Sequence, residues 1–213
     1  MIAVVDYGMG NLHSVAKALE HVAGGQTVVV TSDPAEITKA DRVVFPGQGA
    51  APDCMRAIDA HGLREAIQTA AETKPFLGIC MGLQVLFEHS AEGNTACLGL
   101  FDGDVQRFAP DLHTAAGDRL KVPHMGWNNV RQVAHNAMRH PLWAGIADGE
   151  RFYFVHSYFV VPQDRAIVAG ETDYPTPFAC AVARDNRFAV QFHPEKSAAA
   201  GLHLLSNFVT WQP

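Results

Sequence analysis

The first half of the chain alternates short apolar runs with segments of helical periodicity. The apolar runs are rich in β-branched residues and predict buried strands at residues 2–5, 27–30, 43–45 and 76–79. Apolar positions at helical spacing predict helices over residues 12–22, 51–61, 63–73 and 81–89, with Asn11 in the N-cap position of the first. Strands that alternate with helices form right-handed crossovers. This half therefore predicts a parallel sheet covered on both faces.

The second half has few helical segments between its apolar runs. Strands are predicted at residues 105–108, 128–132, 152–160, 166–171, 179–184 and 188–192. Strands joined by short connections pair in the antiparallel sense. Residues 89–99 and 109–117 read as loops, and a last helix is predicted from Glu195 to about Thr210. Because no interdomain linker interrupts the pattern, residues 1–213 are predicted to form one α/β domain, a mainly parallel sheet extended by antiparallel strands.

Composition and charge argue against several classes of function. The net charge is −6 and no basic run occurs, which argues against a nucleic-acid partner. No apolar stretch reaches the roughly 18 residues of a membrane span. The segment from Met1 to Asp6 lacks the basic and long apolar regions of a signal peptide and reads as a short strand.

The cysteines and histidines suggest neither a disulfide framework nor a metal site. The four cysteines form no CxxC pair, which favours the reducing cytoplasm, and Cys54, Cys97 and Cys180 read as small buried hydrophobes. The histidines show no HxxxH pairing. A dinucleotide fingerprint beginning at Gly8 is incomplete, because His13 stands where its third glycine belongs. We therefore expect no metal and no cofactor.

One cysteine differs from the others because glycines flank it at both i−2 and i+2. The motif lies between a predicted strand and a predicted helix and reads Gly78-Ile79-Cys80-Met81-Gly82. It is the thiol counterpart of the G-x-S-x-G elbow, in which a strained turn needs small neighbours and lifts the nucleophile clear of the sheet. The helix that follows would direct its N-terminus at the sulfur and favour the thiolate. A tight strand-to-helix connection without chemistry is the alternative interpretation.

A second motif supplies a base and a carboxylate at the end of the last predicted strand. In His193-Pro194-Glu195 the two groups can lie on one side of a turn, where the carboxylate orients the imidazole. A strand-end histidine followed by a helix-start glutamate would give the same sequence. Both this motif and Cys80 fall at carboxyl ends of strands, where open α/β sheets build their sites. Their joint presence favours nucleophilic catalysis.

A glycine-flanked loop follows the third predicted strand. It contains Gly47, Gln48 and Gly49 and could offer a backbone N–H to an oxyanion. A simple strand-ending turn remains the alternative.

These motifs together resemble the triad glutamine amidotransferases, which hydrolyse glutamine through a γ-glutamyl thioester and pass on ammonia. Further stretches resemble the glutaminase subunits of imidazole glycerol phosphate synthase, of histidine biosynthesis, and the resemblance covers the chain nearly end to end. The stretches that carry it are Gly78 to Gln84, Gln191 to Glu195, Asp6 to Leu12, Pro123 to Asn128 and Tyr153 to Tyr158. Of these, the segment Pro123-His124-Met125-Gly126-Trp127-Asn128 is the most specific.

The resemblance implies a role for each matching residue. Cys80 would be the nucleophile, His193 the general base and then acid, and Glu195 its orienting carboxylate. The backbone N–H groups of Gln48 and Met81 would form the oxyanion hole. The residues expected to bind L-glutamine are Gly47, Gly49, Gln84, His156, Ser157 and Tyr158. Many relatives carry a small apolar residue in place of Gln48, a departure of little weight because only its backbone is used.

The resemblance also implies a partner. The chain has room for a glutaminase site but no recognisable second site for an ammonia acceptor, so that acceptor should bind another chain. By resemblance the partner is a (β/α)8-barrel cyclase in a heterodimer. Interface residues are expected around the mouth of the elbow, at Asn11, Trp127, Tyr153 and Lys196, although the aromatic pair could be core or rim residues and Lys196 a solvated residue at a helix start.

Two other interpretations stay open from the sequence. One is the glutaminase of a different pathway, such as anthranilate or aminodeoxychorismate synthesis, against which the Met-Gly-Trp-Asn segment argues. The other is a regulatory module that has lost activity, against which the complete triad argues.

Overall fold

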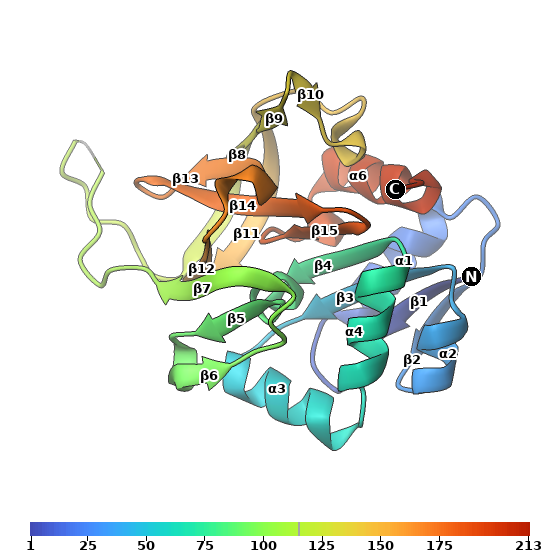
Figure 1. The fold of residues 1–213 in the computed structure, drawn as a ribbon. Helices are drawn as coiled ribbons and strands as arrows, with labels where there is room; N and C mark the ends of the chain where they lie inside the picture. The colour runs from blue at the N-terminus through green and yellow to red at the C-terminus, as the bar shows by residue number, and fades with distance from the viewer. Residues whose placement is uncertain (115) are drawn as a thin grey trace.

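The computed structural model describes residues 1–114 and 116–213, and one 13-stranded sheet takes strands from nearly the whole length of the chain (Figure 1). The strands are β1 (Ile2–Val5), β2 (Val28–Thr31), β3 (Arg42–Gly47), β4 (Phe76–Cys80), β5 (Phe87–Ser90), β6 (Thr95–Ala96), β7 (Phe101–Arg107), β8 (His124–Gln132), β9 (Ala134–His135), β10 (Met138–Arg139), β11 (Glu150–His156), β12 (Tyr158–Pro162), β13 (Val168–Asp173), β14 (Pro177–Arg184) and β15 (Arg187–Val190). The helices are α1 (Leu12–Val22), α2 (Pro34–Lys39), α3 (Ala51–Ala60), α4 (Arg64–Thr73), α5 (Met81–Gln84) and α6 (Ala198–Thr210). Single 3-10 turns are η1 (Glu92–Asn94), η2 (Pro141–Trp143), η3 (Arg165–Ile167) and η4 (Pro194–Lys196).

One end of the sheet is a block of five parallel strands. Their order is β2-β1-β3-β4-β15, and each neighbouring pair is parallel. Strand β14 then pairs antiparallel with β15, and β12 and β7 continue in the antiparallel sense. The predicted parallel sheet with an antiparallel extension is confirmed. It places β4 and β15, which lead into the two predicted catalytic motifs, side by side.

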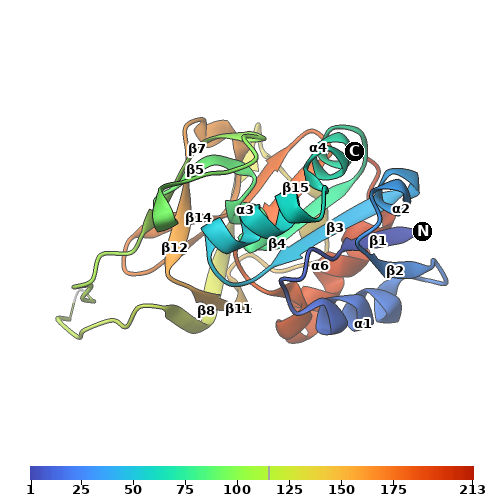
Figure 2. The ribbon, with the colours of Figure 1, turned by 90° about the horizontal axis from the view of Figure 1, so that it is seen from below.

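Helices cover both faces of the parallel block, as the first half of the sequence predicts. Helices α2, α3 and α4 lie on one face and α1 and α6 on the other (Figure 2). Strand β1 shows how the sequence achieves this: Ala3 and Val5 join the core on the α3–α4 side, whereas Ile2 and Val4 join the core on the α1–α6 side. Alternate side chains of a strand point to opposite faces, so a wholly apolar strand buries both of them.

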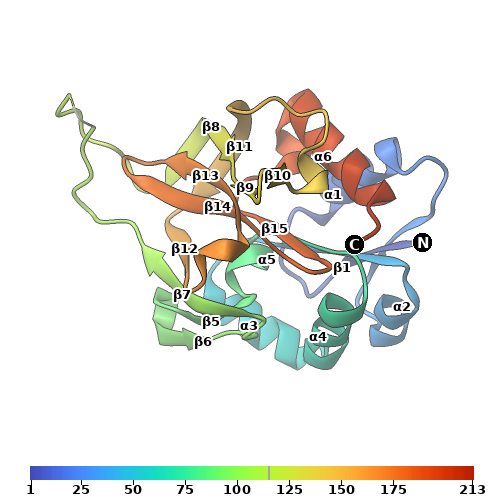
Figure 3. The same ribbon diagram turned by 45° about the horizontal axis from the view of Figure 1, so that its top comes forward.

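Strands β8 and β11 form an antiparallel ribbon that joins the sheet through β13. Figure 3 shows the ribbon on the same side of the sheet as α6. Phe152 and Phe154 of β11 belong to the same core as Leu204 and Leu205 of α6. Burial of these apolar side chains fixes the ribbon beside the carboxyl end of β15.

Two predicted elements differ from the structure in ways that matter to the site. The helix predicted over 81–89 lasts one turn, as α5, and the chain then forms β5. All residues from 80 to 87 are buried, so the segment has no polar face for an amphipathic helix. The strand predicted over 152–160 is two strands that break at Ser157, because β11 pairs with β8 and β12 pairs with β7.

Smaller elements were not predicted. Helix α2 is short, and β9 and β10 form a two-residue hairpin of exposed residues with little periodicity to detect. Asn11 is the N-cap residue of α1 as predicted, but its side chain makes no capping hydrogen bond. Within residues 1–114 and 116–213, no helix has both the length and the apolar character that crossing a bilayer requires.

Candidate active site

Cys80 occupies the strained turn that its motif predicts. It ends β4 and begins α5 with φ 56° and ψ −110°, a conformation that side chains with a Cβ rarely adopt. Such strain persists only where the surrounding structure imposes it, and it is common at catalytic residues. The turn directs the sulfur into a pocket, although Cys80 is only 5% exposed.

The flanking glycines are needed because backbone packs directly against them. A Cβ added at Gly82 would lie 1.9 Å from the carbonyl oxygen of Phe45 in β3. A Cβ at Gly78 would lie 2.8 Å from the carbonyl oxygen of Gly82. The glycine pattern in the sequence therefore reflects close packing both within the elbow and against strand β3.

His193 and Glu195 form a buried pair beside the elbow. His193 Nδ1 lies 2.9 Å from Glu195 Oε1, and the side chains are 8% and 1% exposed. Pro194 and Glu195 belong to η4, so the turn places both groups on one side. Ser197 braces this turn, because its hydroxyl donates to the His193 carbonyl at 2.6 Å and accepts the Tyr153 N–H at 3.0 Å.

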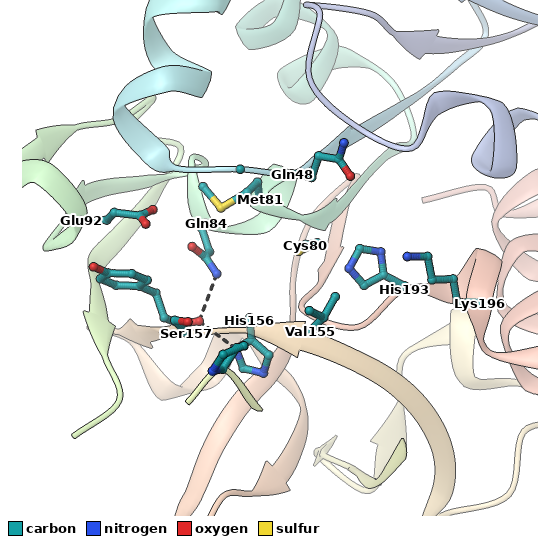
Figure 4. Close-up of a pocket in the computed structure, with 13 residues that line it drawn as sticks. Gln48, Cys80, Met81, Gln84, Glu92, Val155, His156, Ser157, His193 and Lys196 are labelled. Carbon is teal, nitrogen blue, oxygen red and sulfur yellow. Dashed lines mark hydrogen bonds between the residues drawn. The ribbon is translucent and has the colours of Figure 1, made fainter. Parts of the chain in front are cut away.

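The electrostatic setting of His193 favours its protonated form. Burial lowers the pKa of the imidazole, but the neighbouring Cys80 and the Glu195 carboxylate outweigh burial and raise that pKa to about 10. Its Nε2 is buried and has no hydrogen-bond partner among the described residues, while the ring lies beside Cys80 (Figure 4). A cationic imidazole next to sulfur favours a thiolate.

A cavity of about 350 Å³ opens over the sulfur. In Figure 4, Glu92 and Gln84 lie toward one end and Cys80, His193 and Lys196 toward the other. The lining residues are Gln48, Gly49, Cys80, Met81, Gln84, Glu92, Pro123, Val155, His156, Ser157, Tyr158, His193 and Lys196. A cavity of this size with a few polar groups suits a small polar ligand.

The structure brings nearly all the predicted site residues to this cavity. Two predicted catalytic or glutamine-binding residues do not line it: Glu195 is buried against His193, and Gly47 is buried where a Cβ would lie 2.2 Å from Tyr7 Oη and 2.8 Å from Met81 Cβ. The turn that follows β1 packs against the same loop, since a Cβ at Gly49 would lie 2.7 Å from Met9 Cε. The glycine-rich turn thus supports the loop beside Cys80.

Three of the four predicted interface residues lie together, and one of them, Lys196, lines the cavity. The rings of Trp127 and Tyr153 meet edge to face at 6.2 Å between centroids, and Lys196 Nζ lies 5.9 Å from the Tyr153 ring. Trp127 is 45% exposed. Asn11 precedes α1, a helix that contacts η4 and hence the catalytic turn.

Three residues near the chemistry were not predicted. Glu92 lines the cavity from η1, Gln191 Nε2 lies 3.7 Å from Cys80 Sγ, and Ser197 braces the catalytic turn. Glu92 falls in a segment predicted as loop, where nothing in the sequence marks it. Gln191 belongs to the stretch that carries the family resemblance and could have been noticed there. In the described part of the chain, no group of three or more His, Cys, Asp or Glu residues could hold a metal ion.

Comparison with known proteins agrees with this geometry. The family model for class-I glutamine amidotransferases matches residues 3–211. The chain is 70% identical, over all of its length and 92% of the relative's, to the imidazole glycerol phosphate synthase subunit HisH of Thiobacillus denitrificans. It is 67% identical to the same subunit of Dechloromonas aromatica, over all of its length and 97% of that protein's.

A solved glutamine amidotransferase has the same fold, with a TM-score of 0.71 at 15% identity over 98% of this chain and 99% of the other. The chain therefore belongs to the class-I glutamine amidotransferases, in the branch formed by the HisH subunits of imidazole glycerol phosphate synthase.

Proposed function

We propose that this chain, as one domain over residues 1–213, hydrolyses glutamine at Cys80 and passes the ammonia to a separate cyclase subunit in histidine biosynthesis. The observation that carries the proposal is the meeting of the strained Cys80 turn with the buried His193–Glu195 pair at one end of the cavity. The identity to HisH subunits supports this pathway over anthranilate or aminodeoxychorismate synthesis.

The polar groups of the cavity suit the two ends of glutamine. Glu92 is the one carboxylate among the described lining residues, and it suits the α-ammonium group. The backbone of residues 156–158 also borders the cavity and offers N–H and C=O groups to the α-amino and α-carboxylate groups. Anchoring this end extends the carboxamide toward Cys80.

The chemistry then follows from the groups around the sulfur. The Cys80 thiolate attacks the carboxamide carbon, and the backbone N–H groups of Gln48 and Met81 stabilise the oxyanion that forms. His193 gives a proton to the leaving nitrogen, so ammonia departs and a γ-glutamyl thioester remains. His193 next takes a proton from a water molecule, which attacks the thioester. The tetrahedral intermediate expels the Cys80 thiolate and His193 stays protonated, so the starting state is restored, and the new γ-carboxyl group loses its proton to solvent as glutamate leaves. Glu195 holds the imidazole in the orientation that both steps need.

The ammonia acceptor belongs to a partner, for which we propose a (β/α)8-barrel cyclase in a heterodimer. Met125 and Trp127 alternate along β8 and are 62% and 45% exposed, so they form an apolar surface beside the cavity. Tyr153, next to Trp127, also contacts the catalytic turn through its backbone: its carbonyl accepts the His193 N–H at 2.9 Å. A partner seated on this surface would therefore act close to the base.

The cytoplasm is the proposed location, since all four cysteines are free thiols and suit a reducing compartment.

The experiment that tests the site uses a glutamine analogue with an electrophilic carbon in place of the carboxamide. We expect one covalent adduct, found on Cys80 by peptide mass mapping, and loss of glutamine-dependent ammonia release on adduct formation. Cys80→Ala should abolish both signals without loss of the fold, and Cys80→Ser should be nearly as inactive because a hydroxyl ionises far less readily. Cys97→Ala, which removes the half-buried thiol outside the cavity, is the matched control. Near-normal ammonia release from Cys80→Ala would refute the assignment.

A further inference from the structure

Two buried histidines connect the glutamine cavity to strand β8. His156 Nδ1 lies 2.8 Å from the carbonyl oxygen of Tyr158, and His156 Nε2 lies 2.8 Å from His124 Nδ1. At the far end, Asn128 Nδ2 lies 3.2 Å from His124 Nε2. Only His156 of these three side chains lines the cavity, while Asn128 stands beside the exposed Trp127.

One carbonyl sets the direction of every hydrogen bond in this row of side chains. The Tyr158 carbonyl can only accept, so His156 carries its proton on Nδ1 and its Nε2 accepts from His124 Nδ1. His124 Nε2 is then left to accept from the Asn128 amide. Burial supports this neutral arrangement, since it lowers the pKa of His156 to about 3 and that of His124 to about 4.

The same carbonyl fixes the orientation of two buried amides that lead to the nucleophile. Gln84 Nε2 donates to the Tyr158 carbonyl at 3.0 Å and to Gln191 Oε1 at 2.9 Å. Gln191 Nε2 therefore faces Cys80 Sγ, at 3.7 Å. Rotating the Gln84 amide by 180° would place its oxygen against two acceptors. The Tyr158 carbonyl thus determines which end of Gln191 meets the sulfur.

The remaining polar atom of the Gln84 side chain, Oε1, makes no hydrogen bond among the described residues. Gln84 is 2% exposed, and its Oε1 is buried without a partner among the described residues. A buried acceptor without a partner is costly, so an N–H group of the bound ligand is its natural donor. The orientation that gives Gln191 its role also gives Gln84 a fixed acceptor in the cavity.

We propose that Gln191 is a further catalytic residue, whose amide N–H stabilises the Cys80 thiolate. His124 and His156 are positioning residues: through the Tyr158 carbonyl they hold the amides of Gln84 and Gln191 in the required orientation. The inference rests on Cys80 being the nucleophile of the proposed function. The Gln191 amide is an uncharged hydrogen-bond donor to the sulfur, whereas His193 acts on the sulfur as a cation. Hydrogen bonds to charged groups are stronger than those between neutral groups, so the donor stabilises the thiolate more than the thiol.

The test of Gln191 measures thiolate formation directly and does not depend on glutamine hydrolysis. The rate of Cys80 alkylation by iodoacetamide is followed by peptide mass mapping from pH 5 to pH 9 in the chain and in Gln191→Met, which keeps the side-chain length but removes the donor. We expect alkylation at the acidic end to be about tenfold slower in Gln191→Met, with the profile moved to higher pH. Gln132→Met is the matched control: Gln132 is a buried glutamine that donates to the Ile146 and Ala147 carbonyls. It should lose stability yet keep the profile.

An unchanged profile in a folded Gln191→Met chain would overturn the role of Gln191, even if glutaminase activity fell. Should that variant fail to fold, Gln191→Glu is measured instead. Its carboxylate has no N–H and adds negative charge, so the profile must again move to higher pH, and one that does not move refutes the role.

The positioning role is tested at His124, which lies outside the cavity lining. His124→Phe removes the donor to His156, whereas His124→Asn can place an amide N–H where Nδ1 stands. We expect His124→Phe to raise the KM for glutamine and to slow Cys80 alkylation, and His124→Asn to restore both in large part. Equal behaviour of the two variants would show that His124 contributes packing alone. If alkylation responds as expected but the unsubstituted chain does not hydrolyse glutamine even with the cyclase and its ligand, the network stands and the proposed function fails.

Discussion

At the scale of single residues, the candidate site combines a strained thiol with a buried ion pair. The strain belongs to the backbone of Cys80, with φ 56°, whereas the charge belongs to His193 and Glu195, whose side chains are almost entirely buried. Burial raises the cost of any unpaired charge, so the carboxylate and the sulfur must both stay close to the imidazole. The raised pKa of His193 is the consequence.

The two members of the ion pair should differ in their effect on the rate. In the proposed mechanism His193 transfers the proton in both steps, whereas Glu195 only orients the ring. We expect His193→Asn to reduce kcat more than Glu195→Gln does, by roughly tenfold or more. Steady-state ammonia release with the cyclase and its ligand present measures both. A larger loss for the Glu195 variant would reverse the assigned roles.

The residue pattern could predict the triad but not all of its surroundings. Cys80 and His193 sit in motifs whose spacing has a steric or electrostatic reason, and that reason is visible in the sequence. Glu92 reaches the cavity, and Gln191 reaches the Cys80 sulfur, because of how β5, η1 and β15 are placed. Their contribution depends on tertiary packing, which no local spacing encodes.

At the scale of elements, the site depends on how closely the Cys80 turn packs on strand β3. Neither Gly82 nor Gly78 leaves room for a side chain. A Cβ at Gly82 would lie less than 3 Å from the Phe45 carbonyl oxygen in β3, and a Cβ at Gly78 would lie less than 3 Å from the Gly82 carbonyl oxygen. Helix α5 lasts only one turn, so the helix dipole anticipated from the sequence acts over a short length. The neighbouring N–H groups and His193 are left as the main sources of positive potential.

Gly82→Ala tests this packing. The added methyl group would lie 1.9 Å from the Phe45 carbonyl oxygen, so either β3 or the elbow must move. We expect a loss of about 1–3 kcal/mol in the free energy of unfolding, measured by urea denaturation. We also expect Cys80 to lose nearly all of its preference over the other cysteines in alkylation. Gly24→Ala is the control. Its added Cβ would meet no atom within 4 Å, and the φ of +58° at this position costs about 1 kcal/mol in the free energy of unfolding. Equal effects at the two positions would contradict the steric account.

Elements were predicted well where the apolar periodicity is strong, and poorly where the choice of neighbouring strand fixes the bounds of a strand. The parallel block and its helices follow from apolar runs and helical spacing. The break at Ser157 does not, because the apolar pattern continues through it while the strand changes partner from β8 to β7. This change of partner is what exposes residues 156–158 to the cavity, so the functional segment lies where local patterns give least information.

At the scale of the whole molecule, the buried His124 and His156 and the partly buried His140 should make the fold sensitive to acid. Burial lowers the pKa of His124 and His140 to about 4 and that of His156 to about 3, whereas in the unfolded chain each titrates near 6.5. Between these values the unfolded state binds more protons, so stability falls as the pH drops below about 6.5. Each group contributes at most about 1.4 kcal/mol per pH unit to the slope.

His140→Asn isolates one of these contributions away from the site. His140 caps η2 by accepting the Leu142 N–H at 3.2 Å, and an asparagine oxygen can accept the same bond. We expect the variant to show a shallower dependence of unfolding free energy on pH between 4 and 6.5, with stability near pH 8 little changed. Urea denaturation across this range measures the slope. A slope equal to that of the natural sequence would show that His140 is protonated in the folded chain.

The rate of glutamine hydrolysis should depend on communication with the partner. Ammonia released before the acceptor is bound would be lost, so hydrolysis should be coupled to occupancy of the cyclase. The route on this side is short: Trp127 and Tyr153 meet at the exposed surface, and the Tyr153 backbone bonds both to His193 and to Ser197.

We expect slow ammonia release from the chain alone, faster release with the cyclase, and a further rise of about 5- to 150-fold with the cyclase ligand, which corresponds to a coupling of 1–3 kcal/mol. Ser197→Ala cuts the link between β11 and the catalytic turn and should reduce the ligand-dependent rise more than the affinity for the cyclase. Equal rates in all three mixtures would make this chain a stand-alone glutaminase, whereas an intact ligand response in Ser197→Ala would place the coupling elsewhere.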